Sequence, residues 1–508
     1  MKKNRFTSVD VCFLIASNSK KSYQQLSVTY SAIEPPTWAL LLAESCRSIG
    51  FKVSIIDANA ENLSNNDVLE KISELNPKII CLVVYGQNVN AGTANMRGAV
   101  DITNFLKGNK ISRPIAFIGS HVQALPIETL NNEKNIDIVF TNEGVYALRN
   151  LLKLDNFSSH KLKEIKGIAY REEGKIKINL PEKVVPTERM DQDLPGYAWD
   201  LLPYKKNPLD LYRSPMWHAE YDFEKRSPYA SLQTSLGCVF KCDFCMINLI
   251  NRNDSEEVGV AGHYSNMRFW SPDFIIKEFD KLINMGVRTI RIVDEMFLLN
   301  PKYYIPLCEK LSDRNKDDKL RMWSYSRIDT VKRPEILKLV RKAGIKWLCL
   351  GIESGDKSVR LEVAKGKFDD VDVREVIKKV HEADINVMAN YIYGLPGDTK
   401  ETMQRTYDLS IELCTAGWNT YAAMALPGSQ LYKNALEKKH KLPDSYEGYS
   451  FHSYETQPLP TDTLKAEEIL EYRDKSFINY HQNKTFLEEI KKKFGQKALN
   501  NIKDMTKV

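Results

Sequence analysis

Residues 234–245 read Thr-Ser-Leu-Gly-Cys-Val-Phe-Lys-Cys-Asp-Phe-Cys and place three thiols, Cys238, Cys242 and Cys245, at spacings of four and three. They follow a run, 229–236, that is predicted to be a strand. A closed zinc site normally takes a fourth Cys or His, whereas a cubane iron–sulfur cluster held by three thiolates leaves one iron free for another ligand. The spacing therefore favours an open cluster; the alternatives are a zinc knuckle and three buried thiols.

A regular alternation of predicted strands and helices surrounds this stretch. Each short apolar, β-rich run is followed by an amphipathic segment with helical spacing. Six such units predict a partial (β/α)6 barrel, whose chemistry lies on the loops at the carboxyl ends of the strands. The predicted strands span residues 230–234, 289–293, 321–326, 347–351, 386–393 and 419–425.

Polar residues stand at the carboxyl ends of several of these strands, where they can meet at one end of the barrel. A carboxylate there can neutralise a buried cation, and an arginine can present a planar fork to a carboxylate. Arg327 can equally pair with Asp329 or Glu353 in a structural network, and the two acids after the second strand can be a solvated loop pair. The candidate residues are Asp294, Glu295, Ser326, Arg327, Glu353 and Tyr391.

In their order and spacing, these motifs resemble the radical S-adenosylmethionine (SAM) enzymes. The resemblance implies that the three cysteines hold a 4Fe-4S cluster, whose open iron chelates the amino and carboxylate groups of SAM. Phe244 fits the aromatic residue usual before the last cysteine. The resemblance also implies which residues contact SAM. Glu295, or Asp294 as the alternative, receives the ammonium group of SAM, Arg327 meets its carboxylate, and Ser326 meets its ribose. Glu353 bonds a ribose hydroxyl, and the adenine lies along the segment that contains Tyr391.

The first 150 residues predict a second α/β unit, a flavodoxin-like (Rossmann-type) doubly wound domain. Its five strands are predicted at 9–16, 52–57, 78–85, 114–118 and 136–141. Ligands of such domains bind at the carboxyl ends of the strands, and those ends are small and polar here.

A domain of this kind before this barrel resembles the cobalamin-binding subclass of the radical SAM superfamily, over residues 5–430. The sequence lacks the Asp-x-His-x-x-Gly motif that supplies the lower cobalt ligand in methionine-synthase-type domains, and many members of the radical subclass lack it too. The resemblance implies a cobalamin site. For His121 two interpretations stay open, a histidine packed within its loop and a histidine that faces the corrin ring. The predicted cobalamin contacts are Tyr85, Gly86, Gly119, Ser120, His121, Glu143 and Gly144.

Three further cysteines, Cys12, Cys46 and Cys81, raise a competing hypothesis. Methylthiotransferases carry cysteines at similar spacing in their amino-terminal domain, where they bind a second iron–sulfur cluster. Here the three residues fall inside a predicted strand, a helix and another strand, whereas cluster ligands should lie on loops. We therefore expect them to be core residues.

Composition limits the remaining choices. The chain has 508 residues, 43% of them apolar, which is enough for two or three domains. Its net charge of +6 is spread over 72 basic and 66 acidic residues, so no nucleic-acid partner is expected. No run is long and apolar enough for a membrane span, and nine cysteines without a disulfide pattern predict a reducing, cytoplasmic location. The predicted parts are a cobalamin-binding-like domain (1–155), a hairpin and aromatic, proline-rich connector (156–228), the radical SAM partial barrel (229–432) and a helical carboxyl-terminal region (433–508).

The resemblance implies an enzyme that methylates an unactivated carbon of a small natural-product, lipid or sugar-like substrate. The alternatives are a cobalamin-dependent radical cyclase or rearrangement enzyme, a methylthiotransferase and a non-catalytic carrier. A radical SAM enzyme also needs an electron donor such as flavodoxin or ferredoxin. The sequence identifies neither the substrate nor the lower cobalt ligand.

Overall fold

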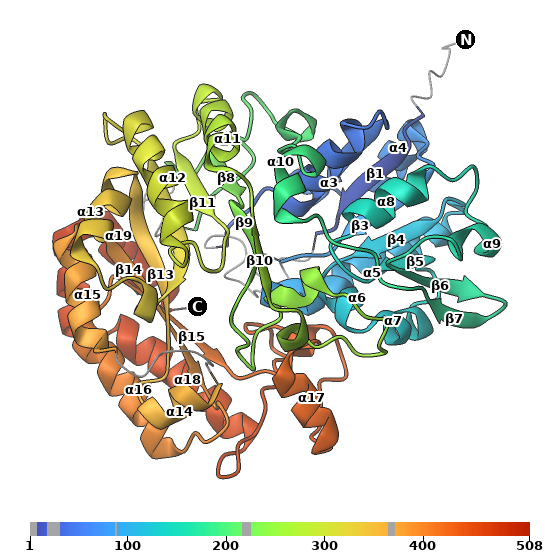
Figure 1. The fold of residues 1–508 in the computed structure, drawn as a ribbon. Coiled ribbons are helices and arrows are strands. Elements are labelled where there is room, and N and C mark those ends of the chain that lie inside the picture. The colour runs from blue at the N-terminus through green and yellow to red at the C-terminus, as the bar shows by residue number, and fades with distance from the viewer. Residues whose placement is uncertain (1–7, 18–30, 87–88, 216–224, 364–370, 508) are drawn as a thin grey trace.

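The computed structural model describes residues 8–17, 31–86, 89–215, 225–363 and 371–507. Two sheet-containing units lie side by side, with the amino-terminal unit on the right of Figure 1 and the barrel on the left. Within the described residues, no helix combines the length and apolarity that crossing a membrane would require.

Five neighbouring strands of the amino-terminal sheet are parallel, in the order β2-β1-β3-β4-β5 with β2 at the edge, which confirms the predicted flavodoxin-like topology. Helices α3 (Thr37–Arg47) and α8 (Val145–Leu152) pack on one face, and α4 (Asn65–Leu75), α5 (Gly92–Gly108) and α7 (Pro126–Asn132) pack on the other. The strands are β1 (Val11–Ile15), β2 (Val53–Asp57), β3 (Ile79–Val83), β4 (Ile115–Ile118) and β5 (Ile138–Phe140).

The hairpin that the sequence places in the connector belongs to this sheet. Strands β6 (Ile168–Glu172) and β7 (Lys175–Ile178) extend it beyond β5, and β6 runs antiparallel to β5. Ile168 and Tyr170 are buried against the core of the α8 face. The hairpin covers what would otherwise be an open edge of the sheet, so the structural unit continues past residue 155.

The rest of the connector packs between the two units, as its aromatic content predicts. The Ala198 N–H donates to the Leu40 carbonyl in α3, while Trp199 Nε1 donates to the Glu278 carboxylate (3.3 Å) in α11 (Pro272–Asn284) of the barrel. Trp217, which the sequence also places in the connector, lies outside the described residues.

Six parallel strands form the predicted partial barrel, in the spatial order β8-β11-β12-β13-β14-β15. The helices that cover its outer face are α11, α12 (Pro301–Arg314), α13 (Pro334–Lys342), α15 (Val373–Glu382) and α16 (Lys400–Leu413) (Figure 1). The strands are β8 (Tyr229–Leu232), β11 (Thr289–Ile292), β12 (Arg321–Arg327), β13 (Ile345–Glu353), β14 (Asn386–Tyr393) and β15 (Gly417–Ala422).

A two-stranded antiparallel ribbon that the sequence does not predict holds the cysteine loop. In it, β9 (Ser235–Cys238) pairs with β10 (Asn266–Phe269), and Cys238 lies opposite Asn266. Gly237 has φ +81°, and a Cβ there would lie 2.1 Å from the Asn266 carbonyl oxygen. Only glycine fits this close approach, so Gly237 fixes where the chain leaves the ribbon at the first cysteine.

The carboxyl-terminal region is helical at both ends and irregular between them. Its helices are α17 (Gln430–Glu437), α18 (Ala466–His481) and α19 (Lys484–Met505), and Tyr480 of α18 stacks on Trp418 of β15 at 4.9 Å. The irregular part reaches the amino-terminal unit, where the Tyr446 hydroxyl donates to the Glu133 carboxylate (2.9 Å). The predicted helical region therefore also bridges the two units.

Candidate active site

The three cysteines of the loop after β9 line a cavity at the carboxyl ends of the barrel strands. Glu295 follows β11, Ser326 and Arg327 end β12, and Glu353 ends β13, and all four line the same cavity. The structure thus gathers four of the six residues predicted to contact SAM around the cysteines.

Cys238 is buried, Cys242 and Cys245 are partly buried, and burial disfavours the charged form of all three thiols. It raises the pKa of Cys238 to about 11 and that of Cys242 to about 12, and it raises the pKa of Cys245 well above its usual range. Arg327 opposes this effect at Cys238 and Cys242. A bound metal centre deprotonates its thiol ligands. Three sulfurs that share a buried cavity with a cation therefore fit a cluster held by three thiolates.

The arrangement differs from that of a site for one ion. Among the residues that the structure describes, no group of three or more His, Cys, Asp or Glu side chains is placed to hold a single metal ion. A cubane cluster makes a different demand, because each thiolate binds a different iron.

Asp294 and Glu295 are neighbours in sequence but have different surroundings. The Asp294 carboxylate accepts hydrogen bonds from the Thr234 N–H (2.6 Å) and hydroxyl (2.6 Å) and from the Ser235 hydroxyl (2.5 Å). Glu295 faces the cavity, and no described residue donates a hydrogen bond to it. Burial raises the pKa of Glu295 to about 7, an effect that Arg291 partly opposes. Of the two acids, Glu295 is the one available to a ligand's cationic group.

Arg327 is held in place on two sides. Its Nε and Nη2 donate to the Asp329 carboxylate at 2.9 and 2.6 Å, and its guanidinium lies 3.6 Å from the centre of the Phe240 ring in the cysteine loop. The structural pairing with Asp329 is therefore present, and Arg327 still lines the cavity. Beside it, the Ser326 hydroxyl accepts a hydrogen bond from the Leu298 N–H (3.2 Å).

Glu353 has an unusual backbone conformation for a glutamate. Its φ is +64°, and the pairing register between β13 and β14 shifts at this point. The side chain folds back over Gly351, where a Cβ would lie 2.4 Å from Glu353 Oε1. Strained conformations of this kind gather at functional sites. Burial raises the pKa of Glu353 to about 7, although the positive charges of Arg327 and Arg360 act to lower this pKa.

The Tyr391 side chain points away from the cavity. Successive side chains of a strand point to opposite faces, and in β14 it is Asn390 and Ile392 that line the cavity. Tyr391 is fully buried on the other face, with its ring 6.3 Å from that of Trp418. A contact of this segment with the adenine of SAM therefore stays a prediction, and its side chains on the cavity side are Asn390 and Ile392.

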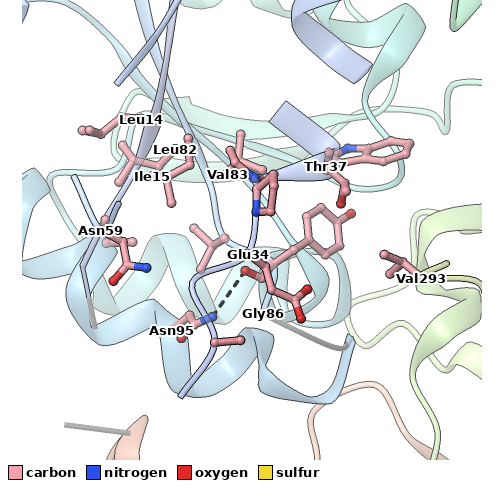
Figure 2. A pocket seen from close by; sticks show the side chains of 18 of the residues that line it. Leu14, Ile15, Glu34, Thr37, Asn59, Leu82, Val83, Gly86, Asn95 and Val293 are labelled. Carbon is pink, nitrogen blue, oxygen red and sulfur yellow. Dashed lines mark hydrogen bonds between the residues drawn. The ribbon is translucent and has the colours of Figure 1, made fainter. Parts of the chain in front are cut away.

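A second cavity lies in the amino-terminal unit at the carboxyl ends of β1 and β3 (Figure 2). The strand order reverses here, which is where flavodoxin-like domains bind their ligands. Tyr85 and Gly86, both predicted cobalamin contacts, line it, and the Asn95 side-chain amide donates to the Tyr85 carbonyl (3.3 Å). Val293 of the barrel stands on the opposite side (Figure 2).

The other predicted cobalamin contacts lie outside this cavity and serve packing. A Cβ at Gly119 would lie 2.1 Å from the Val84 carbonyl oxygen, and one at Gly92 would lie 1.9 Å from the Ser120 hydroxyl. Gly144 has φ +77° immediately before α8. Gly119 thus brings two backbone segments close together, the Ser120 side chain packs on Gly92, and Gly144 supplies the left-handed backbone turn that leads into α8.

His121 and Glu143 are also used structurally. The His121 ring lies edge-on to that of Tyr446 at 5.3 Å, and its Nδ1 is 3.2 Å from the Thr93 hydroxyl. Burial lowers the pKa of His121 to about 4, so the imidazole is neutral at pH 7. Glu143 forms a buried ion pair with Arg268 Nη1 (2.7 Å) and accepts a hydrogen bond from the Val185 N–H (2.6 Å). Both side chains thus have partners inside the protein, and a contact of either one with cobalamin stays a prediction.

A third cavity lies between the first two. Tyr85 and Gly86 line both it and the cavity at β1 and β3, whereas Glu295 and Ile247 line both it and the barrel cavity. A row of neighbouring cavities therefore joins the ligand end of the amino-terminal sheet to the cysteine loop.

The cysteines of the competing hypothesis lie in the core. Cys12 packs on one face of the amino-terminal sheet, and Cys46 and Cys81 pack on the other. Burial raises the pKa of Cys12 and that of Cys46 to about 12. Residues on opposite faces of one sheet cannot bind the same cluster. The three cysteines are therefore core residues, as the sequence predicts from their positions in two strands and a helix.

The sequence missed several cavity residues. Asn90 from the amino-terminal unit, Met424 and Leu426 after β15, and Phe451 from the irregular carboxyl-terminal segment all line the barrel cavity. Met424 lies within the last predicted strand, 419–425, and Leu426 directly follows it, so both could have been found there. Asn90 and Phe451 belong to no motif, and only the tertiary fold brings them to the site.

Fold and site together define a radical SAM protein with an added flavodoxin-like domain. Residues 232–410 match the Radical SAM superfamily, and residues 25–152 match the B12 binding domain. The chain thus combines a B12-binding domain with a radical SAM domain, and the cofactors of this combination are a 4Fe-4S cluster, SAM and cobalamin.

Relatives of known sequence span most of the chain. It is 25% identical to the anaerobic magnesium-protoporphyrin IX monomethyl ester cyclase of Cereibacter sphaeroides, with 89% of this chain and 67% of that protein covered. It is 24% identical to an uncharacterised methyltransferase of Pyrococcus horikoshii, with 88% of each covered. A hopanoid C-2 methylase of Rhodopseudomonas palustris is 31% identical over 44% of this chain and 41% of that protein.

Two solved structures share the fold. The radical SAM methyltransferase TsrM from Kitasatospora setae superposes with a TM-score of 0.63 at 15% identity, covering 85% of this chain and 78% of that one. The cobalamin-dependent radical enzyme OxsB gives a TM-score of 0.58 at 17% identity, with 85% and 56% covered.

Proposed function

We propose that this enzyme transfers a methyl group to an unactivated carbon of a small natural-product, lipid or sugar-like molecule. The observation that carries the proposal is the row of three cavities, because methyl transfer needs the cobalamin site and the SAM site to face a common space. Relatives described as a methyltransferase and a methylase add support.

Each barrel-cavity residue that was predicted to hold the cluster or SAM has a proposed task. Cys238, Cys242 and Cys245 hold the cluster, Glu295 receives the ammonium group of SAM, and Arg327 meets its carboxylate. Ser326 and Glu353 serve the ribose. When bound, the cluster supplies the electron that cleaves SAM to methionine and a 5′-deoxyadenosyl radical, and cobalamin supplies the methyl group.

The protein's own contribution is to position the reactants and to exclude water. Phe240 and Phe244 of the cysteine loop, with Met424 and Leu426 opposite, give the cavity apolar walls. At the loop's outer side Val239 is 50% exposed and Lys241 is exposed. We propose that an electron donor such as flavodoxin or ferredoxin approaches the cluster there.

Changing Glu295 to glutamine tests the placement of SAM. The substitution keeps the shape of the side chain and removes the charge, and losing one partner of a desolvated charge pair commonly costs a few kcal/mol. We expect SAM to bind at least about tenfold more weakly, with the iron content unchanged. Equilibrium dialysis of the anaerobic protein measures the affinity, and Glu309→Gln on the exposed face of α12 is the matched control. Unchanged affinity in Glu295→Gln would move the ammonium site elsewhere.

The products of turnover test the reaction. Methyl transfer by this route uses two molecules of SAM, one giving methionine and 5′-deoxyadenosine and the other giving S-adenosylhomocysteine as cobalamin is methylated again. Both nucleosides should accumulate together in similar amounts, as measured by liquid chromatography and mass spectrometry.

One relative is a cyclase, so a cyclase or rearrangement enzyme is the second candidate. Product formation with 5′-deoxyadenosine and no S-adenosylhomocysteine supports that candidate and rejects methyl transfer.

A further inference from the structure

The barrel cavity has a part that no predicted cofactor residue occupies. The charged side chains on its wall are Glu295, Arg327 and Glu353, and the proposed function uses all three for SAM. Apart from the β14 segment assigned to the adenine of SAM, the remaining described wall carries no charged side chain and is mainly apolar, with Ile247, Met296, Met424, Leu426 and Phe451.

This apolar part is built from segments far apart in the chain. Met424 and Leu426 follow β15 and belong to a core cluster against which Phe244 and Phe451 pack. The Phe451 ring lies 4.9 Å from that of Tyr421, and the Arg473 guanidinium donates to the Phe451 carbonyl. Phe451 is therefore held firmly, although it comes from an irregular segment.

Asn90 supplies a polar group to the same cavity. Among the described residues that line it, Asn90 alone comes from the amino-terminal unit. Its side-chain oxygen is buried, and no described residue donates a hydrogen bond to it. A buried acceptor without a partner is costly, and a ligand that supplies a donor removes that cost.

We infer that the substrate places an uncharged apolar ring or chain against Met424, Leu426 and Phe451 and donates one hydroxyl or N–H to Asn90. The inference rests on the proposed function, because the three charged residues are set aside for SAM. A carboxylate or phosphate in this subsite would meet no cation on the described wall, and an unpaired buried ion is strongly disfavoured. Asn90 thus links substrate recognition to the domain that holds cobalamin.

Three probes that share one ring system test the subsite. They are naphthalene, 1-naphthol and 1-naphthoate, which differ in having no polar group, a hydroxyl donor or a charge. Equilibrium dialysis against the anaerobic holoprotein with SAM bound measures their affinities. We expect 1-naphthol to bind about tenfold more tightly than naphthalene, and 1-naphthoate to bind more weakly than 1-naphthol by at least about tenfold.

Two variants assign the contacts. Asn90→Ala should lower the affinity for 1-naphthol to that for naphthalene, whereas Phe451→Ala should weaken both by about tenfold. Asn132→Ala, at an exposed position of α7, should change neither. Three outcomes would overturn the inference. They are equal affinities for 1-naphthoate and 1-naphthol, an Asn90→Ala variant that still prefers 1-naphthol to naphthalene as strongly as the unchanged protein does, and no binding of any probe.

The measurement needs no turnover. The predicted probe affinities together with an absence of S-adenosylhomocysteine would leave this subsite standing and reject methyl transfer. If the probes do not bind as expected but the protein forms both nucleosides, the subsite is rejected and methyl transfer stands.

Discussion

Replacing Cys242 by alanine should remove the iron–sulfur cluster and reduce SAM cleavage to background. The cluster has three protein ligands at most in this loop, and their pKa values show that the buried thiols have little tendency to ionise without a metal. Two thiolates cannot hold a cubane that needs three. We expect the same result for Cys238→Ala and Cys245→Ala. Iron and sulfide analysis and the yield of 5′-deoxyadenosine under reducing conditions measure it.

Buried cysteines elsewhere are the matched controls. Cys308→Ala in α12 and Cys12→Ala in β1 remove a fully buried thiol without touching the loop, so each should cost about 1 kcal/mol of stability and leave the iron content unchanged. An iron content near eight per chain that falls to about four in Cys46→Ala or Cys81→Ala would instead establish a second cluster and the methylthiotransferase hypothesis.

The success of sequence analysis at the barrel has a physical cause. The cysteine loop and the residues after β11, β12 and β13 are local motifs, and the parallel strand topology brings local motifs to one end of the barrel. Asp294 and Glu295 show the limit of this reasoning. The resemblance favours Glu295 and keeps Asp294 as the close alternative, because the sequence does not show that Thr234 and Ser235 of another strand end occupy Asp294.

The ligand-binding residues of the amino-terminal domain were harder to predict from the sequence, because the place where the ligand binds depends on the order of the strands in the sheet. The order β2-β1-β3 puts the reversal between β1 and β3, but a sequence of alternating strands and helices does not reveal which strands are neighbours. Tyr85 and Gly86 follow β3 and line the cavity at this reversal. Ser120 and His121 follow β4, beyond the reversal, where polar side chains take part in packing.

Breaking the ion pair between Glu143 and Arg268 should destabilise the protein by about 3–5 kcal/mol. The pair joins the amino-terminal unit to β10, the strand beside Cys238, and both side chains are almost completely buried. Burial already raises the pKa of Glu143, and Arg268 opposes that effect. In Arg268→Met the carboxylate loses this partner inside the protein, so it must take up a proton or draw in water.

Denaturation by urea, followed by tryptophan fluorescence, measures the loss for Arg268→Met. The double variant Glu143→Gln with Arg268→Met should recover much of it, because removing both charges avoids an uncompensated buried ion. Arg314→Met breaks an exposed pair with Asp280 (3.1 Å) and should cost no more than about 1 kcal/mol. If Arg268→Met behaves like Arg314→Met, the pair does not hold the two units together. A large loss confined to Arg268→Met would show that the buried Glu143 carboxylate of the amino-terminal unit needs its partner on the cysteine ribbon. This pairing explains why Glu143 lies at a strand end without facing the ligand cavity.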